Sequence, residues 1–131
     1  MVIDTSALIA ILLGEPEAEK FAKAIISNEK RLLSAFSALE TGVVIEARKG
    51  NLGKQELDLL LFYTKIEIVA LNDQQMQLAM EAWRKFGKGH HPAKLNLGDC
   101  CSYALAKYLD EPLLFKGNDF NQTDIKIVQL T

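Results

Sequence analysis

The chain has 131 residues, of which 49% are apolar and 24% are charged, a balance that is typical of one globular domain. Fifteen Lys and Arg against seventeen Asp and Glu give a formal net charge of −2, which excludes a generically basic nucleic-acid coat. No apolar run is long enough to span a membrane, and the first residues lack the positive region of a secretory signal. Two adjacent cysteines, Cys100 and Cys101, indicate no disulfide framework. We therefore expect a cytoplasmic protein.

Short apolar segments alternate with helical patterns along the chain. The pattern predicts, in order, a strand over residues 1–3, helices over 7–12 and 17–27, a strand over 31–33, helices over 34–49 and 54–63, a strand over 66–71, a helix over 72–86, a loop over 87–94, a helix over 97–108, and strands over 113–115 and 125–130. This alternation predicts an α/β fold in which helices cover both faces of a parallel sheet. One domain over residues 1–131 accounts for all of these elements.

Four acidic side chains lie where the chain leaves a predicted strand or begins the next helix. They are Asp4, Glu40, Asp99 and Asp119. Because the carboxyl ends of parallel strands meet at one edge of a sheet, we expect these carboxylates to lie together. Taken singly, each has a simpler interpretation as a helix cap, a capping box that begins at Ser37, a charge at a helix N-terminus or a turn residue.

Four carboxylates at one edge repel one another, and a bound cation would relieve that repulsion. Oxygen ligands without Cys or His select a hard ion, Mg²⁺ or Mn²⁺ rather than zinc. Such an ion keeps coordination positions for water and for phosphate oxygens. The acids therefore favour a metal-dependent phosphodiester hydrolase.

The four acids lie within stretches that match a known pattern. The stretches are Met-Val-Ile-Asp-Thr-Ser-Ala-Leu at 1–8, Ser-Ala-Leu-Glu at 37–40, Leu-Asn-Leu-Gly-Asp-Cys at 95–100, and Leu-Phe-Lys-Gly-Asn-Asp-Phe at 114–120 with Thr-Asp-Ile at 123–125. In this order they resemble the motifs of PIN-domain ribonucleases of the VapC toxin type. The resemblance covers the whole chain, and the four motifs together are specific where the first alone would be weak.

The resemblance implies a three-layer sandwich with a central five-stranded parallel sheet, and an endoribonuclease that cleaves RNA with Mg²⁺ or Mn²⁺ and a metal-activated water. By this resemblance Asp4 and Asp99 would hold the ion, Glu40 would orient the water or bind the ion through it, and Asp119 would complete the site. Asp124 is interpreted as a turn residue or a helper.

The resemblance also implies partners, namely a VapB-type antitoxin that inhibits the toxin and a second copy of the chain in a homodimer. The apolar side chains of residues 52–63, with Leu57, Leu60 and Leu61, are one candidate partner surface. The N-terminal helical hairpin is another. An amphipathic segment of the antitoxin would bind in a groove near the acids.

Polar residues beside the acids have two open interpretations. Thr5 and Ser6 would orient the carboxylate of Asp4 or contact a phosphate, or they would cap the first helix. Asn118 would support Asp119 or simply form a turn.

Cationic residues near the acids are candidates for RNA binding. Arg84, Lys88 and Lys94 belong to a stretch without acids that precedes the helix of Asp99, and Lys116 lies beside the turn of Asp119. They would steer RNA toward the carboxylates, or they would form a solvated helix end and loop. Trp83, next to this stretch, would stack on bases, but core packing is the favoured interpretation.

Three alternatives use the same acids differently. A receiver-like signalling domain normally has two adjacent acids after its first strand, where this chain has only Asp4. A phosphatase with Asp4 as nucleophile would need a second Asp at the position of Ser6. A catalytically weak PIN domain that acts as an RNA-binding or scaffold module is the main alternative, although all four acids are present.

Overall fold

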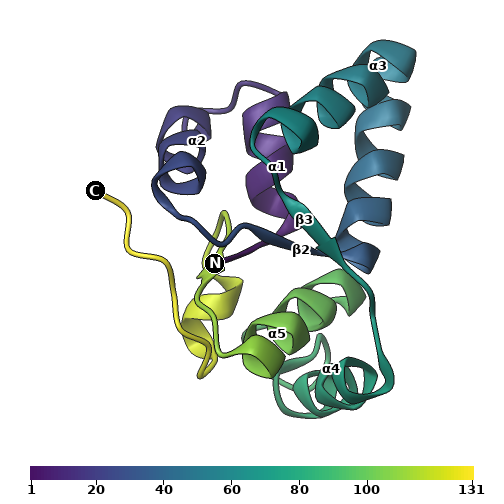
Figure 1. Cartoon of the computed structure of the whole chain (residues 1–131). Helices are drawn as coiled ribbons and strands as arrows, with labels where there is room; N and C mark the ends of the chain where they lie inside the picture. The colour runs from purple at the N-terminus through teal and green to yellow at the C-terminus, as the bar shows by residue number, and fades with distance from the viewer.

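A parallel sheet of four strands lies between two layers of helices in the computed structural model, which describes residues 1–131 (Figure 1). The elements are β1 (Val2–Ile3), α1 (Thr5–Leu12), α2 (Ala18–Ser27), β2 (Leu32–Ser34), α3 (Ala35–Tyr63), β3 (Glu67–Val69), α4 (Asp73–Phe86), α5 (Leu97–Leu109), β4 (Leu113–Leu114) and the 3-10 helix η1 (Asp119–Gln122). The strand order is β3-β2-β1-β4, and every neighbouring pair is parallel. The predicted α/β class is confirmed.

Alternate strand residues enter two separate cores on the two faces of the sheet. Val2 and Leu113 pack with Tyr103 and other side chains of α4 and α5. Ile3 and Leu114 pack with side chains of α1 and α2. Figure 1 shows α4 and α5 below the sheet and the other three helices above it. The period-two alternation of the strands thus produces the predicted three layers.

The predicted fifth strand over 125–130 is reduced to one bridge, between Leu113 and Ile127. Leu113 donates its backbone N–H to the carbonyl of Lys126 at 2.9 Å and accepts from Val128 N at 3.1 Å. β4 is only two residues long and follows Pro112, which has no N–H to donate. The edge therefore offers pairing for a single residue, and the prediction of five strands is wrong.

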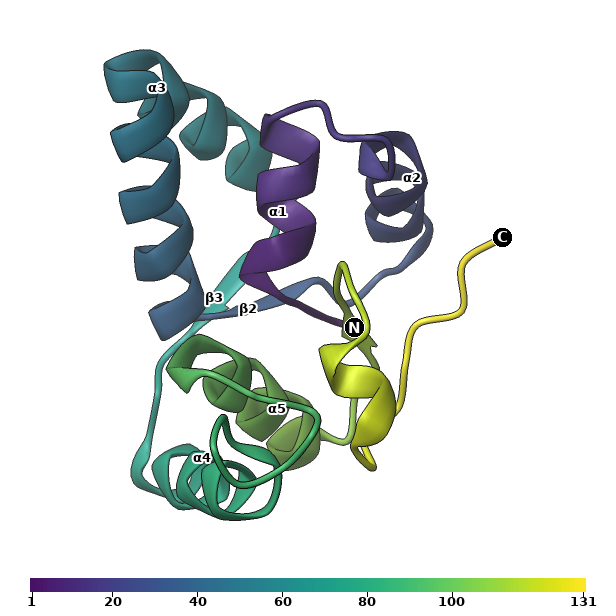
Figure 2. The ribbon, with the colours of Figure 1, turned by 180° about the vertical axis from the view of Figure 1, so that it is seen from behind.

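Helix α3 contains the two helices predicted over 34–49 and 54–63. Gly50 breaks the helical conformation with φ 61° and ψ −148°, so the helix folds back on itself as two arms, a first arm over 35–49 and a second arm over 51–63 (Figure 2). A Cβ added at Gly53 would lie 2.6 Å from the carbonyl oxygen of Ile45. Glycine at this position therefore lets the two arms pack in close contact.

The N-terminus of α3 corrects one sequence interpretation. Ser34 is the N-cap, and its side chain accepts the N–H of Phe36. Ser37 lies inside the helix and is fully buried. The capping box predicted for Ser37 and Glu40 is therefore wrong, and both side chains are available for contacts with other elements. None of the helices has the length and apolar character that crossing a membrane requires.

Candidate active site

Three of the four predicted acids lie at the starts of helices along one edge of the sheet. Asp4 is the N-cap of α1, Glu40 lies in the second turn of α3, and Asp99 lies in the first turn of α5. In Figure 2 the first turns of α1 and α3 lie directly above α5. The parallel topology thus brings together side chains that are 95 positions apart in the sequence.

Asp4 is held by three hydrogen-bond donors and is only 3% exposed. Its Oδ1 accepts from the hydroxyl of Ser102 at 2.6 Å. Its Oδ2 accepts from the hydroxyl of Ser6 at 2.6 Å and from the Ser6 backbone N–H at 3.1 Å. Ser6 therefore orients the carboxylate, as one of its two predicted roles required, and Asp4 caps α1 at the same time.

A network of buried hydroxyls lies beside Asp4 and joins α1, α3 and α5. The hydroxyls of Ser37 and Ser102 are 3.1 Å apart. The backbone carbonyl of Ser37 accepts from the hydroxyl of Thr41 at 2.7 Å and from that of Thr5 at 3.2 Å. Thr5 therefore supports the network rather than contacting Asp4 directly. Buried polar groups that are satisfied in this way rigidify a site.

Glu40 and Asp99 are brought together by a glycine. A Cβ added at Gly98 would lie 2.5 Å from Oε1 of Glu40 and 2.7 Å from Oε2. The carboxylate of Glu40 therefore occupies the space that any other residue at position 98 would fill with its side chain. Since Asp99 is the next residue, this contact places two of the predicted acids side by side.

Asp99 has the most perturbed carboxyl group of the site. Burial, followed by the charges of Asp4, Asp119 and Glu40, raises its pKa from 3.8 to about 7. The hydrogen bond from the Asn96 N–H, 3.1 Å long and part of a capping box, opposes that shift. Asp99 is thus an acid in the first turn of a helix, as its simpler interpretation required, and also a member of the acid cluster.

Asp119 and Asp124 prove to be distinct. Asp119 is exposed at the first position of η1, and its charge reaches Asp99. Asp124 instead accepts a hydrogen bond from the hydroxyl of Tyr103 and pairs with Lys107 at 2.7 Å, two helical turns along α5 from the acids. Asp124 therefore secures the C-terminal segment. Of the two, only Asp119 contributes charge to the cluster.

Two candidate neighbours have contacts of their own. The Asn118 side-chain oxygen accepts from the amide of Asn121 at 3.1 Å, which is the turn role. The backbone N–H of Lys116 donates to the Ser6 hydroxyl at 2.9 Å, whereas its ammonium pairs with Glu15 at 2.9 Å and Glu17 at 3.5 Å. The main chain of Lys116 thus supports the site, while its charge is directed to the segment between α1 and α2.

Several functional neighbours were missed by sequence reasoning. Ser102 follows Asp99 by three positions, so the two lie on one face of α5. Gly98 was noted only as part of a motif, yet it determines where Glu40 lies. The helical spacing was the one available signal for Ser102. The glycine contact joins two helices and has no local signature.

The donor set of the site suits a hard divalent cation. The candidate ligands are carboxylate oxygens only, and Asp4, which is buried, has no cationic side chain among its hydrogen-bond partners. No three acidic, His or Cys side chains converge into a preformed metal cage. Mg²⁺ binds through one or two protein carboxylates and keeps several waters. Asp4 and Asp99, with Glu40 beside them, are the residues that would hold such an ion.

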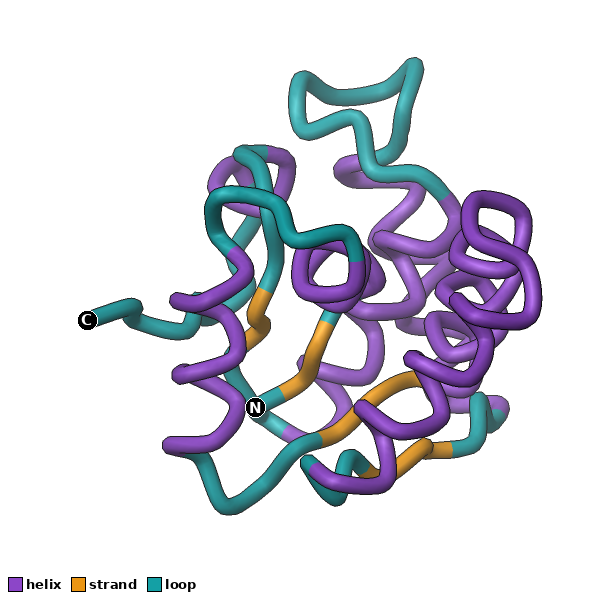
Figure 3. Tube along the Cα trace, turned by 90° about the horizontal axis from the view of Figure 1, so that it is seen from above, coloured by secondary structure: helices purple, strands orange, loops and turns teal.

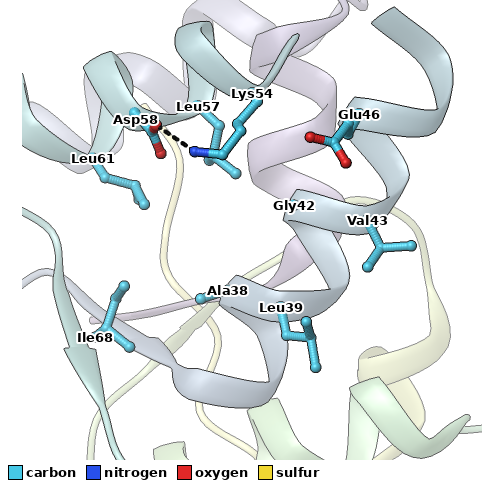
Figure 4. Close-up of a pocket in the computed structure, with 10 residues that line it drawn as sticks. All are labelled: Ala38, Leu39, Gly42, Val43, Glu46, Lys54, Leu57, Asp58, Leu61 and Ile68. Atoms are coloured by element: carbon cyan, nitrogen blue, oxygen red, sulfur yellow. Dashed lines mark hydrogen bonds and ion pairs between the residues drawn. The ribbon is translucent and has the colours of Figure 1, made fainter. Parts of the chain in front are cut away.

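A groove lies between the two arms of α3 and β3 (Figure 4). Its lining includes Leu39, the neighbour of Glu40 in the chain, and Val43 one turn later. Both side chains are exposed. We call this surface the α3 groove, and it is lined by Ala38, Leu39, Gly42, Val43, Glu46, Lys54, Leu57, Asp58, Leu61 and Ile68. Leu57, one of the predicted partner residues, also lines the groove and is only 5% exposed.

Comparison with known proteins agrees with these observations. The PIN domain family model matches residues 1–126. VapC ribonuclease Mb0640 of Mycobacterium bovis is 53% identical over 130 residues, covering 99% of both chains. Mycobacterium tuberculosis VapC20, described as a sarcin–ricin loop cleaving toxin, superposes with a TM-score of 0.79 at 16% identity over 98% of both chains. A toxin–antitoxin complex from Klebsiella pneumoniae superposes with a TM-score of 0.74 at 19% identity, over 97% of this chain and 95% of the other.

Proposed function

The chain belongs to the PIN domain family and, within it, to the VapC ribonucleases, and on that premise we propose how its carboxylates cut RNA. We infer that Asp4, Glu40, Asp99 and Asp119 form the catalytic site and bind Mg²⁺ or Mn²⁺. The observation that supports this most directly is the position of α5. Its first two turns supply Asp99, contact Glu40 at Gly98 and hold Asp4 through Ser102.

The protein groups divide the work of phosphodiester hydrolysis. When bound, the cation stabilises charge on the phosphate oxygens and lowers the pKa of water toward neutrality. Asp4, fixed by its three hydrogen bonds, presents its carboxylate without reorganisation. Glu40, whose carboxylate lies against Gly98 beside Asp99, would orient the attacking water. Asp119, exposed at the rim, completes the negative site that receives the cation.

Metal-dependent cleavage of RNA tests this proposal. The purified chain, free of antitoxin, is incubated with mixed cellular RNA and Mg²⁺ or Mn²⁺, with EDTA as one control. Asp4→Ala should remove nearly all cleavage, whereas Asp73→Ala, which alters an exposed acid at the start of α4, should leave it unchanged. Cleavage that persists in Asp4→Ala would exclude the assigned site. RNA that binds to the metal-loaded wild type but is never cut would favour a binding module.

A VapB-type antitoxin is the partner that we propose for the α3 groove. The Klebsiella structure with the same fold is a toxin–antitoxin complex. The groove exposes apolar side chains of Leu39 and Val43, and Lys54 and Asp58, 2.9 Å apart, place charge at its border. An amphipathic helix with an apolar face fits such a lining. Because Leu39 adjoins Glu40, an occupant of the groove would also obstruct access to the acids.

A homodimer is the remaining partner in the proposal. The second arm of α3 leaves Leu59, Phe62 and Tyr63 exposed, the last two by more than 70%. Large apolar side chains that gather on one surface mark an interaction site. Sedimentation of the purified chain tests this part: a monomer at all concentrations would contradict it.

A further inference from the structure

The end of α4 and the loop that follows form a cationic surface in a chain of net negative charge. Residues 84–94 contain four cations and no acid. All four are exposed, and the ion pairs of the structure involve other lysines. They are Arg84, Lys85, Lys88 and Lys94. A cluster of unpaired cations attracts a polyanion, and its attraction is strongest where no acids are interspersed.

This loop has a fixed conformation because its two ends are joined. Gly87 and Leu95 form a parallel bridge, in which the Lys88 N–H donates to the Leu95 carbonyl and the Leu95 N–H donates to the Phe86 carbonyl, both at 2.9 Å. Ala93 and Leu95 are fully buried and anchor the loop to the body. The loop between Gly87 and Leu95 stands out from the helices at the top of Figure 3. The cations are therefore displayed on a preorganised platform.

An aromatic pair lies on the same platform. The rings of Trp83 and His90 meet edge to face, with centroids 4.5 Å apart and planes at 87°. Trp83 remains 43% exposed, so the prediction that it packs in the core is wrong. Phe86, by contrast, packs against the core and lies 5.8 Å from the Tyr103 ring. A large exposed indole beside cations is the combination that binds single-stranded nucleic acid, because bases stack on the ring while cations contact phosphates.

We propose that Trp83 and His90 bind an unpaired base of the RNA substrate, with Lys88 and Lys94 on the neighbouring phosphates. The inference rests on the proposed ribonuclease function and adds to it a base-binding surface outside the acid cluster. Trp83 precedes the Gly87–Leu95 bridge by four residues, and Asp99 follows it by four. Because the bridge joins Gly87 to Leu95, Trp83 and Asp99 are each four residues away from one point of the fold, so the bound base and the scissile phosphate would be a few nucleotides apart.

The surface discriminates between unpaired and paired RNA by its chemistry. A base within a duplex is stacked on both faces and offers nothing to the Trp83 ring. A flipped or looped base offers a free face, and stacking on an aromatic side chain strengthens binding about fivefold or more. Contacts of lysines with phosphates are indifferent to pairing. Trp83 and His90 are therefore substrate-binding residues outside the acid cluster.

Intrinsic fluorescence tests the proposal directly, because Trp83 is the only tryptophan of the chain. The Asp99→Asn variant, which retains an acceptor for the Asn96 N–H, is titrated in Mg²⁺ with a single-stranded RNA of about eight nucleotides, a length that suits such surfaces. The same strand in a duplex and an abasic strand of equal length are the matched probes. Labelled RNA reports total binding by anisotropy in parallel.

We expect the single strand to quench Trp83 and the abasic strand to bind with little quenching. His90→Ala should weaken binding of the single strand about fivefold or more, whereas His90→Phe, which restores an aromatic ring, should recover it. Equal quenching by the abasic strand, RNA binding without quenching, or no RNA binding would each overturn the proposal. Cleavage of RNA by the wild type is measured separately. If RNA is cleaved but does not quench Trp83, this inference is refuted and the proposed ribonuclease function is not.

Discussion

Gly98 and Glu40 are in such close contact that a methyl group on the glycine would lie 2.5 Å from a carboxylate oxygen. The contact joins the first turn of α5 to the second turn of α3. Glycine here is thus required by a neighbouring helix and not by the backbone conformation. The position of Glu40 beside Asp99 depends on it.

Replacement of Gly98 by Ala should separate activity from stability. The added methyl group displaces the end of the flexible Glu40 side chain, and displacement of a catalytic group by about 1 Å costs on the order of 100-fold in rate. Alanine is also more stable than glycine in a helix by about 0.5–1 kcal/mol. We therefore expect RNA cleavage to collapse while the free energy of unfolding, measured with urea, stays equal or rises.

Gly42→Ala is the matched control. Gly42 lies in α3, and a Cβ there would find its nearest atom at 4.0 Å, on Leu57. The same gain in helix propensity is expected without loss of cleavage. Full activity in Gly98→Ala would show that Glu40 need not occupy its present position.

Ser102→Ala should destabilise the fold through Asp4. The hydroxyl of Ser102 donates at 2.6 Å to a carboxylate that is 3% exposed, and a buried hydrogen bond to a charged group contributes about 1.5–3 kcal/mol. The free energy of unfolding in urea should fall by about that amount. Ser27→Ala, at the exposed end of α2, should change it by less than about 0.5 kcal/mol.

A double-mutant cycle attributes this loss to the pair. If Ser102 acts on Asp4, the losses in free energy of unfolding caused by Ser102→Ala and by Asp4→Ala should be non-additive. The expected coupling is about 0.5–3 kcal/mol, the range for groups in direct contact. Additive effects would mean that Ser102 stabilises the fold through Ser37 alone, its other partner.

The sites of the acids were predictable because they follow from topology. β1 and β2 end at one edge of the sheet and lead into the helices of Asp4 and Glu40, whereas Asp99 begins α5, which follows α4 through a loop and packs against both strands. Two of these residues also have an ordinary local role, since Asp4 is the N-cap of α1 and Asp99 belongs to the capping box of α5. Local and functional interpretations were therefore compatible for Asp4 and Asp99.

The remaining features depend on contacts between distant segments, which a local pattern does not encode. Ile125 and Ile127 alternate with polar Lys126 as in a strand, yet β4 offers only Leu113 for pairing. Trp83 has the helical spacing of a core residue, but the loop that returns to α4 brings His90 against its edge and leaves it exposed. In both cases the length or course of a neighbouring segment decided the outcome.

The stability of the metal-free protein should decrease with rising pH through the titration of Asp99. Its pKa is raised from 3.8 to about 7 by burial and by the charges of Asp4, Asp119 and Glu40. Between these two pH values the folded state binds a proton that the unfolded state has lost. The free energy of unfolding contributed by Asp99 therefore falls as the pH rises from 3.8 to about 7.

Urea unfolding in EDTA at several pH values measures this slope. Asp99→Asn, which cannot ionise, should gain stability relative to the wild type as the pH rises through that interval. Addition of Mg²⁺ should reduce the difference, because a bound cation offsets the repulsion. A difference between the two chains that is the same at every pH would contradict the shifted pKa.

Neutralising the loop cations should weaken RNA binding and flatten its salt dependence. If Lys88 and Lys94 each contact one phosphate of a single strand, the double alanine variant should lose about 1.4 from the slope of log K against log salt. Lys20→Ala with Lys23→Ala, two exposed positions on α2, is the control and should leave the slope unchanged. An unchanged slope in the Lys88→Ala, Lys94→Ala variant would show that these lysines do not contact RNA phosphates.

A charge in the α3 groove should release the enzyme from its antitoxin without impairing cleavage. Val43 is 60% exposed in the groove, one turn beyond Leu39, so Val43→Asp should be tolerated by the fold. Burial of that carboxylate under an apolar helix would be unfavourable, and the affinity for a cognate VapB-type antitoxin should fall by about tenfold or more. Binding is measured by calorimetry, and inhibition by the loss of RNA cleavage.

Leu52→Asp provides the matched comparison, since Leu52 is equally exposed on the second arm of α3 but does not line the groove. Both variants add one negative charge to the same helix, so general electrostatic effects cancel between them. If the antitoxin binds in the groove, only Val43→Asp should escape inhibition. Equal loss of affinity in both variants would show that the antitoxin does not bind in the groove. Inhibition of the enzyme would then not arise from an occupant of the groove that obstructs Glu40.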